Sequence, residues 1–198
     1  KPVFVNSDEL IMRQAEKIAL FTGRVKAWQD NNTILASELQ MQGNGETVTA
    51  RGGVRTVLYN TGTDGRKTPV QTTSEQLVAR KPDRRIDLVG KVTIVDETRT
   101  MKSEKAAFFF NDKNKIQRIE SEQNVNVVEA ASRRQGTGDK AVYHVDKKMI
   151  YLNGAPATVS DPTGSITGQQ IAFDLARDRV QVVSPETQTK GTYKHEGS

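Results

Sequence analysis

The sequence predicts an all-β protein in which antiparallel strand pairs stack into one elongated array. Three observations support this: a recurring six-residue pattern, alternating apolar strands between its copies, and turn-forming residues between the strands. Each copy of the pattern has a small residue, two polar or charged residues, an aliphatic residue, any residue, and a bulky or apolar residue. A period of roughly 20–50 residues is typical of repeat architectures, in which each unit buries its apolar face by stacking on its neighbours.

Six copies of the hexapeptide occur along the 198 residues, and their starts are separated by 29, 38, 29, 35 and 30 residues. Such an array favours a function that lies in a continuous surface rather than in a point-like active site. The copies are residues 7–12 (SDELIM), 36–41 (ASELQM), 74–79 (SEQLVA), 103–108 (SEKAAF), 138–143 (GDKAVY) and 168–173 (GQQIAF).

An alternating strand with Gly-x-Val, or a relative of it, follows most copies of the hexapeptide. In residues 86–94 every second residue is apolar or glycine, and polar residues such as Asp87 and Lys91 lie between them. Period-2 alternation predicts half-buried strands with one apolar and one wet face. The strands of this kind are residues 19–27, 50–54, 86–94, 125–127 and 150–154.

Turn-forming residues separate these strands, and the array is predicted to be a single elongated domain over residues 1–198. Asn, Asp, Gly and Pro are the residues that tolerate positive φ or favour tight turns. They cluster at 30–32, 43–45, 111–114, 146–148 and 161–164. Residues 60–73 are rich in Gly, Thr and Pro and are predicted to form a mobile loop insertion, which explains the 38-residue step. Residues 186–198 are predicted to be a polar tail.

One segment also fits a helix. Residues 7–21 could form an N-capped amphipathic helix with Leu10, Ile11 and Ile18 on one side. The alignment of residues 7–12 with the other hexapeptides favours strand–turn–strand instead.

Composition argues against several classes of function. The 29 basic residues are interleaved with 24 acidic ones, and the aromatic residues form no stacking platform, so nucleic-acid binding is not expected. The chain has no cysteine, and its two histidines, His144 and His195, belong to no set with metal-ligand spacing. Because no nucleophile elbow, P-loop or dinucleotide fingerprint occurs either, we predict no enzyme, no catalytic residue, no metal and no cofactor.

Two surface features have more than one interpretation. Basic doublets at predicted turns could meet phosphates at the rim of a groove, or could be ordinary solvated turn tips; they are Arg84-Arg85, Arg133-Arg134 and Lys147-Lys148. Trp28 is the only tryptophan. It could anchor an interface or merely cover an edge of the sheet.

The ordered series of elements resembles the OstA-like, or LptA, family of periplasmic lipopolysaccharide transport proteins. The resemblance is carried by residues 86–92 (IDLVGKV) followed by 103–110, and by 138–143 followed by 150–156 (IYLNGAP), and it covers roughly residues 19–183. Two features depart from the family rhythm: the predicted insertion at 60–73, and Gln123 where a glycine is expected.

The resemblance implies an open β-jelly roll shaped like a folded taco, whose interior shields the acyl chains of lipopolysaccharide in the periplasm. The implied partners are lipopolysaccharide, other jelly-roll proteins of the transport bridge, and further copies of the chain joined head to tail. The residues expected to line the groove are Phe21, Val25, Leu39, Met41, Leu88, Val92, Ile94, Phe108, Phe110, Tyr143, Leu152, Phe173 and Leu175.

Two alternatives remain open from the sequence. A structural β-repeat scaffold with a filled core and no ligand would use the same apolar face. A glycan-processing enzyme on the same scaffold would need two convergent carboxylates.

Overall fold

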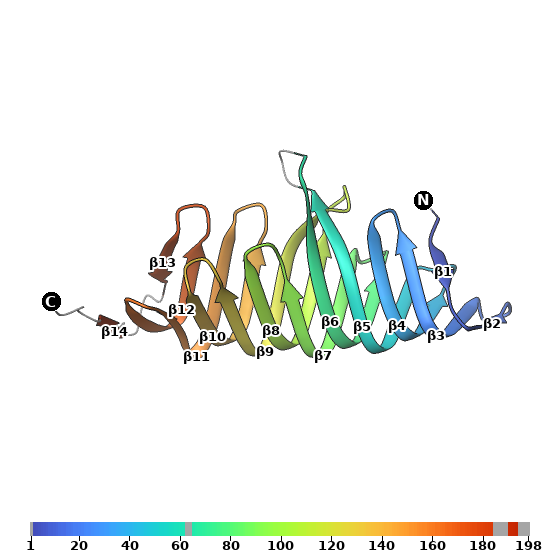
Figure 1. Cartoon of the computed structure of the whole chain (residues 1–198), viewed down its shortest axis with the longest axis horizontal. Coiled ribbons are helices and arrows are strands. Elements are labelled where there is room, and N and C mark those ends of the chain that lie inside the picture. The colour runs from blue at the N-terminus through green and yellow to red at the C-terminus, as the bar shows by residue number, and fades with distance from the viewer. Residues whose placement is uncertain (1, 62–64, 184–189, 194–198) are drawn as a thin grey trace.

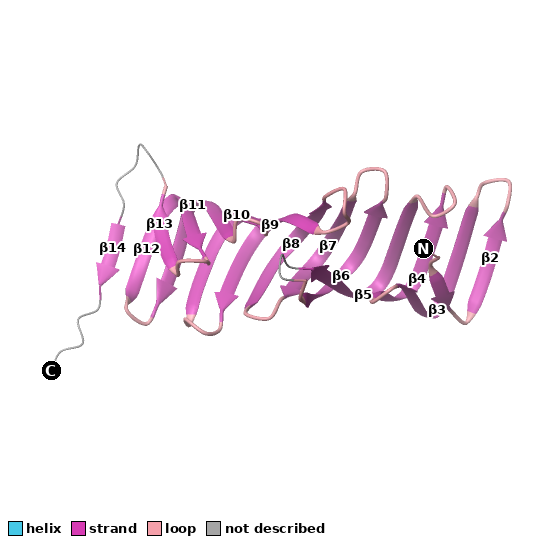
Figure 2. Ribbon diagram, turned by 90° about the horizontal axis from the view of Figure 1, so that it is seen from above, coloured by secondary structure: helices cyan, strands magenta, loops and turns pink. Residues whose placement is uncertain are grey.

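The computed structural model describes residues 2–61, 65–183 and 190–193, and within them the chain forms one open antiparallel sheet. Figures 1 and 2 show a long, narrow array with strands crossing its length. The predicted all-β fold of stacked antiparallel strands is thus confirmed. The strands are β1 (Phe4–Asn6), β2 (Glu9–Arg13), β3 (Ile18–Gln29), β4 (Asn32–Gln42), β5 (Thr47–Thr61), β6 (Lys67–Arg80), β7 (Arg85–Val95), β8 (Arg99–Phe110), β9 (Ile116–Glu129), β10 (Arg134–His144), β11 (Met149–Asp161), β12 (Gly164–Asp174), β13 (Arg179–Val182) and β14 (Lys190–Tyr193).

From β3 to β13 each strand pairs with the next one along the chain. At the N-terminal end both β1 and β2 pair with β3, and at the C-terminal end both β13 and β14 pair with β12. Consecutive hairpins therefore build the sheet from β2 to β13, as short connections between antiparallel strands allow. Among the described residues, no helix is long and apolar enough to cross a membrane.

The sheet is bent lengthwise, because the pairing register shifts near the middle of every long strand. Between β6 and β7, for example, the shift lies between Thr73 and Gln76. Such bulges bend a strand and increase its local twist. Each long strand thus has two legs, and the hairpin turns form two rims: a first rim at 14–17, 43–46, 81–84, 111–115, 145–148 and 175–178, and a second rim at 30–31, 96–98, 130–133 and 162–163.

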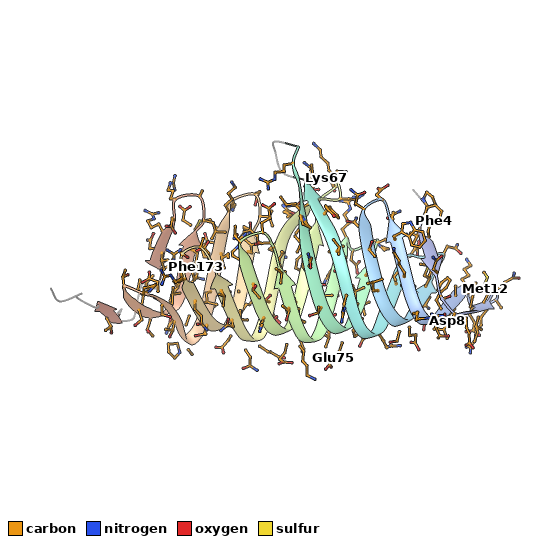
Figure 3. The ribbon with its side chains drawn as sticks, in the orientation of Figure 1. Phe4, Asp8, Met12, Lys67, Glu75 and Phe173 are labelled. Atoms are coloured by element: carbon orange, nitrogen blue, oxygen red, sulfur yellow. The ribbon has the colours of Figure 1, made fainter. Side chains whose placement is uncertain are left out.

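Each copy of the hexapeptide begins at the bend of the sheet. Its first two positions, such as Ser74 and Glu75, fall at the register shift, and Figure 3 shows Asp8 and Glu75 along the lower edge of the molecule. Opposite Glu75, Gly90 and Lys91 adopt left-handed conformations with φ of 83° and 47°. A Cβ atom on Gly90 would collide with the Glu75 side chain, which explains why glycine stands at this position.

Gln123 and Asn124 form the same bend without glycine. Their φ angles are 67° and 55°, close to the values at Gly90 and Lys91. Gln123 therefore replaces the glycine of the Gly-x-Val pattern, and the backbone conformation stays the same. Asparagine adopts this conformation more readily than most residues, which helps the pair to replace glycine.

The segment that fits a helix is a strand, a turn and a strand, as the hexapeptide alignment favours. Strand β2 pairs with β3 in a register that places Leu10 opposite Phe21. Together β1 and β2 cover both legs of β3, with Asp8 at the bend between them.

The predicted loop at 60–73 is wrong over most of its length. Strand β5 continues to Thr61 and β6 begins at Lys67, and Asn60 pairs with Thr68. Strand β6 begins beyond the neighbouring strands, with Lys67 near the top of Figure 3. The threonines that suggested a loop are also favoured in strands. Residues 62–64 lie outside the described residues. Of the predicted polar tail at 186–198, residues 186–189 and 194–198 also lie outside them, whereas 190–193 form β14.

Candidate functional site

The thirteen residues predicted to line a groove all lie in the interior between the legs. Six of them belong to one large buried cluster that extends from β5 to β12: Leu88, Val92, Ile94, Phe108, Leu152 and Phe173. Phe110, Tyr143 and Leu175 pack against it while staying partly exposed. Val25 and Leu39 form a separate, smaller cluster with Phe21 and Met41 against it. The shared inward face is therefore confirmed as a structural feature.

Most of this interior is filled. Phe108 and Leu152 have exposed fractions of 0%, and Leu88 and Val92 of 1%. Side chains packed this closely leave no room for a ligand without separation of the legs. The thirteen residues therefore share one inward face, and the fully buried ones among them are core residues in this conformation. Their contact with lipid stays a prediction.

The N-terminal half is more open. A cavity of about 590 Å³ lies between the legs there, and its lining includes Trp28, Ile34, Leu58, Ile86 and Phe110. A second cavity of about 530 Å³ lies at the N-terminal end, beside β2 and the turn that follows it. Val3, Met41, Val48 and Lys81 line both cavities, so the two are neighbours along one groove.

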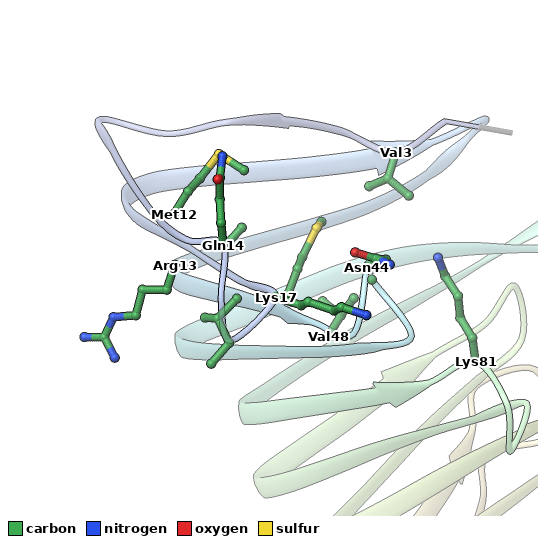
Figure 4. A pocket seen from close by; sticks show the side chains of 12 residues that line it. Val3, Met12, Arg13, Gln14, Lys17, Asn44, Val48 and Lys81 are labelled. Atoms are coloured by element: carbon green, nitrogen blue, oxygen red, sulfur yellow. The ribbon is translucent and has the colours of Figure 1, made fainter.

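Figure 4 shows the end cavity from close by, with Val3 just before β1 and Lys17, Val48 and Lys81 on the neighbouring segments. Arg13 also belongs to its lining, yet its guanidinium points away from the other labelled residues. The groove thus has an apolar floor with cationic groups at its edge, which suits a molecule with an apolar part and an anionic part.

Of the thirteen predicted residues, four line a cavity. Met41 and Phe110 contact the N-terminal cavities, and Ile94 and Tyr143 line a smaller one of about 140 Å³ in the middle of the molecule. Ile34, Val48 and Ile86 also line these cavities and are not among the predicted residues. Alternation does point to Ile86 and Val48, because they lie two residues from Leu88 and Ala50. It cannot tell a residue that lines a cavity from one that fills a core.

Charged side chains surround the mouth of the larger cavity at the turn between β6 and β7. Arg80 and Arg85 both bind the carboxylate of Asp87, at 2.5 and 2.7 Å, and Arg84 pairs with Asp112. One carboxylate balances only one of two guanidiniums, so this cluster keeps positive charge at the mouth. The doublet Arg84-Arg85 therefore lies at the rim of the cavity, where a phosphate could meet it.

The other predicted surface features have different roles. Arg134 is almost fully buried and binds Glu129 and Asp178, whereas its neighbour Arg133 is exposed in a turn. Lys147 and Lys148 are also exposed in a turn. The ring of Trp28 stacks on Phe4, with 5.5 Å between the ring centroids, and also lines the larger cavity. Trp28 thus packs against β1, the short strand that covers one leg of β3 at the N-terminal end of the sheet.

The described residues hold no group of three or more His, Cys, Asp or Glu side chains that could bind a metal. The hydrogen bond from Arg24 lowers the pKa of Asp8, and the hydrogen bond from Lys140 lowers the pKa of Glu122. Both carboxylates lie at the outer side of the bend. A general acid needs a raised pKa inside a cleft, and these two acids show the opposite.

Comparison with known proteins agrees with this architecture. A family model described as "LptA/(LptD N-terminal domain) LPS transport protein" matches residues 4–105 and again residues 71–179. The overlap of the two matches fits a repeated structure that aligns in more than one position. No curated protein matches the chain closely enough to count as a relative.

Among solved structures, the fold is similar to LptH from Pseudomonas aeruginosa, described as the LptA homologous periplasmic component of the conserved lipopolysaccharide transport device. The TM-score is 0.50, with 14% sequence identity, over 98% of this chain and 96% of that chain. At this identity the likeness concerns the fold. The family model covers most of the chain, and the chain therefore belongs to the LptA/LptD N-terminal domain family of lipopolysaccharide transport proteins.

Proposed function

We propose that this chain is a non-enzymatic periplasmic lipid-binding protein that shields the acyl chains of lipopolysaccharide in the groove between its legs. It would form part of the bridge that carries this lipid to the outer membrane. The observation that supports the proposal most directly is the pair of neighbouring cavities in the N-terminal half, with volumes of about 590 and 530 Å³.

The chemistry of these cavities suits an acylated ligand. Ile34, Val48 and Leu58 offer apolar contacts, and each methylene that leaves water contributes about 0.8 kcal/mol. Several acyl chains can thus be held without any directional bond. Lys81 and the Arg80–Asp87–Arg85 cluster place positive charge at the mouth, where an anionic headgroup would remain in water.

Photo-crosslinking tests the carrier role. A benzoylphenylalanine at Ile34 or Met41 should capture lipopolysaccharide, because both positions line the larger cavity. The matched control is Val89, which lies on the outer face with 41% of its surface exposed. Equal capture at Val89 and Ile34, or no capture at either cavity position, would contradict the proposal.

Assembly into a bridge is supported by the ends of the sheet. Among the described residues, strand β2 pairs with β3 alone, and its Leu10, Ile11 and Met12 are 51%, 51% and 64% exposed. An open edge with apolar side chains favours pairing with another strand, and a head-to-tail contact that does not close builds a filament.

Sedimentation analysis checks this part separately. Wild-type protein should form larger species as its concentration rises, and the double change I11K/M12K should abolish them. The control V89K adds a charge away from the ends and should have no effect. A wild type that stays monomeric at every concentration would remove self-association and leave the carrier proposal untouched.

The alternative of a structural scaffold with a filled core is favoured by one observation. Phe108 in β8 and Leu152 in β11 are fully buried. The scaffold predicts no lipid capture at Ile34, so the crosslinking experiment separates the two functions.

A further inference from the structure

We propose that two arginine clasps join the rims in the C-terminal half and act as a gate, so that lipid passes beyond the N-terminal cavities only when they open. This inference rests on the proposed carrier function, because it concerns how far along the groove the lipid can move. The clasps are Arg99 with Tyr143, and Arg134 with Asp178.

The first clasp lies near the middle of the molecule. It crosses the gap between the two rims, which is the mouth of the groove. Arg99 begins β8 at the second rim, whereas Tyr143 lies at the end of β10 beside the first rim. The guanidinium donates a hydrogen bond to the Tyr143 hydroxyl at 3.3 Å and lies 4.6 Å from the centre of its ring. The Arg99 side chain is only 14% exposed.

The second clasp repeats this arrangement two strands further on. Arg134 begins β10 at the second rim, and Asp178 lies in the first-rim turn after β12. Arg134 Nη2 is 3.0 Å from Asp178 Oδ1, and the Arg134 side chain is 10% exposed. Each arginine thus reaches forward across the mouth from the start of one strand.

The clasps lie between larger cavities. The two N-terminal cavities are on one side, and a cavity of about 360 Å³ lined by Val159, Ile166 and Val180 is on the other. A separate and smaller cavity, of about 140 Å³, lies next to Arg99 and Tyr143. The first clasp therefore stands beside a small cavity, between larger ones toward the two ends of the molecule. In the N-terminal half, by contrast, the ion pairs Arg24–Asp8 and Arg51–Glu38 lie near the bend and away from the mouth.

The bonding of the arginines makes the clasps reversible. Each guanidinium is also held by a carboxylate on its own rim: Arg99 by Asp96 at 2.7 Å, and Arg134 by Glu129 at 3.1 Å. When the rims separate, each arginine keeps this partner and loses only its contact across the mouth. Within the described residues, nothing accepts a hydrogen bond from Arg134 Nε, so opening would also let water satisfy a buried donor.

The test uses a chain that has no native cysteine, so spin labels can be placed freely. Labels at A131C and K147C stand on opposite rims at the two ends of β10, and a reference pair at N31C and E46C stands at the two ends of β4. The variants Y143L and D178N each break one clasp and leave the arginine its own-rim carboxylate. D112N is the matched control, because the Arg84–Asp112 pair that it breaks lies along the first rim alone.

Opening of the clasps should shift the 131–147 distance distribution to longer values in Y143L, D178N and their combination, and leave the 31–46 pair unchanged. D112N should behave as wild type. Loss of one exposed or partly exposed contact of this kind should change the ratio of open to closed protein by about two- to fivefold. Unchanged 131–147 distances in the double variant would overturn the gate.

Lipid movement is read with benzoylphenylalanine at Ile34 and at Ile166, using labelled lipopolysaccharide as the probe. The gate predicts capture at Ile34 in every protein, and an increase at Ile166 of about two- to fivefold for each broken clasp. Capture at Ile34 with no change at Ile166 overturns the gate and leaves the carrier function standing. Longer 131–147 distances with no capture at either site would keep the clasps and overturn the carrier function.

Discussion

Glu75 and Lys91 form an ion pair of 3.1 Å on the outer side of the bend, and the Glu75 side chain covers the space where a Cβ atom of Gly90 would stand. The polar second position of one hexapeptide is thereby coupled to the glycine of the following strand. Asp8 and Gly23 have the same relationship, with Asp8 Oδ2 placed 2.5 Å from a Cβ built on the glycine. The two repeated sequence elements thus meet at the bend.

We expect G90A to destabilise the protein for two reasons. Alanine would have to adopt a φ of 83°, and its Cβ would collide with Glu75. The left-handed backbone alone costs about 1–2 kcal/mol. Urea unfolding should show a loss of at least this size in the free energy of unfolding.

The control G53A separates these two causes. Gly53 has a φ of 69° with nothing within 4 Å of a built Cβ, so its replacement adds backbone strain without a collision. Replacing Glu75 by alanine in the G90A protein should recover the part of the collision that is due to the Glu75 carboxyl group, while the Cβ of residue 75, 2.9 Å from the built Cβ, remains. Equal losses for G90A and G53A would show that the collision is relieved by a small movement.

Replacement of Gln123 should act in the opposite direction. Gln123 holds a φ of 67° where the other bends have glycine, so Q123G removes backbone strain. We expect the free energy of unfolding to rise by about 0.5–1 kcal/mol. This gain is smaller than the backbone strain that is removed, because glycine loses more conformational freedom on folding than glutamine does. Q123V, which places a β-branched residue in this conformation, should lower it. Thermal and urea unfolding of the two variants measure both effects.

The bends illustrate what the sequence reveals and what it hides. Period-2 alternation placed Leu88 and Phe108 on one inward face because a strand's geometry fixes that face locally. The conformation of Gln123 and Asn124 was hidden, since it depends on pairing with neighbouring bends. The division of the interior into core and cavity was hidden as well. It depends on how far apart the two legs stand, which no local pattern records. Leu39 and Met41, for example, are both apolar residues at alternating positions, so the pattern cannot distinguish them.

The Asp8–Arg24 pair should make stability depend on pH in the acid range. The hydrogen bond from Arg24 lowers the pKa of Asp8 below its ordinary value of 3.8. A lowered pKa in the folded state stabilises the protein above the unfolded-state pKa, and this contribution disappears as the pH falls through the lowered value. The melting temperature of D8N should therefore change less between pH 5 and pH 2 than that of the wild type. D83N, at an exposed turn, serves as the control. Parallel curves for wild type and D8N would show that the pair makes no net contribution.

Leu39 and Met41 provide the sharpest separation of core from groove. They lie on the same face of β4, yet Leu39 is fully buried while Met41 lines both N-terminal cavities. Removal of a buried leucine leaves a void, so L39A should lower the free energy of unfolding by about 2–5 kcal/mol. M41A enlarges space that is already open and should cost less, because fewer packed contacts are lost.

Capture of lipid should show the opposite order, with M41A having the larger effect. With benzoylphenylalanine at Ile34, M41A should reduce capture of lipopolysaccharide, since Met41 contributes apolar surface to the cavity. A folded L39A protein, studied below its unfolding transition, should keep its capture. If both variants destabilised the protein equally and neither altered capture, the N-terminal cavity would be part of the core, and the lipid would have to bind elsewhere on the chain.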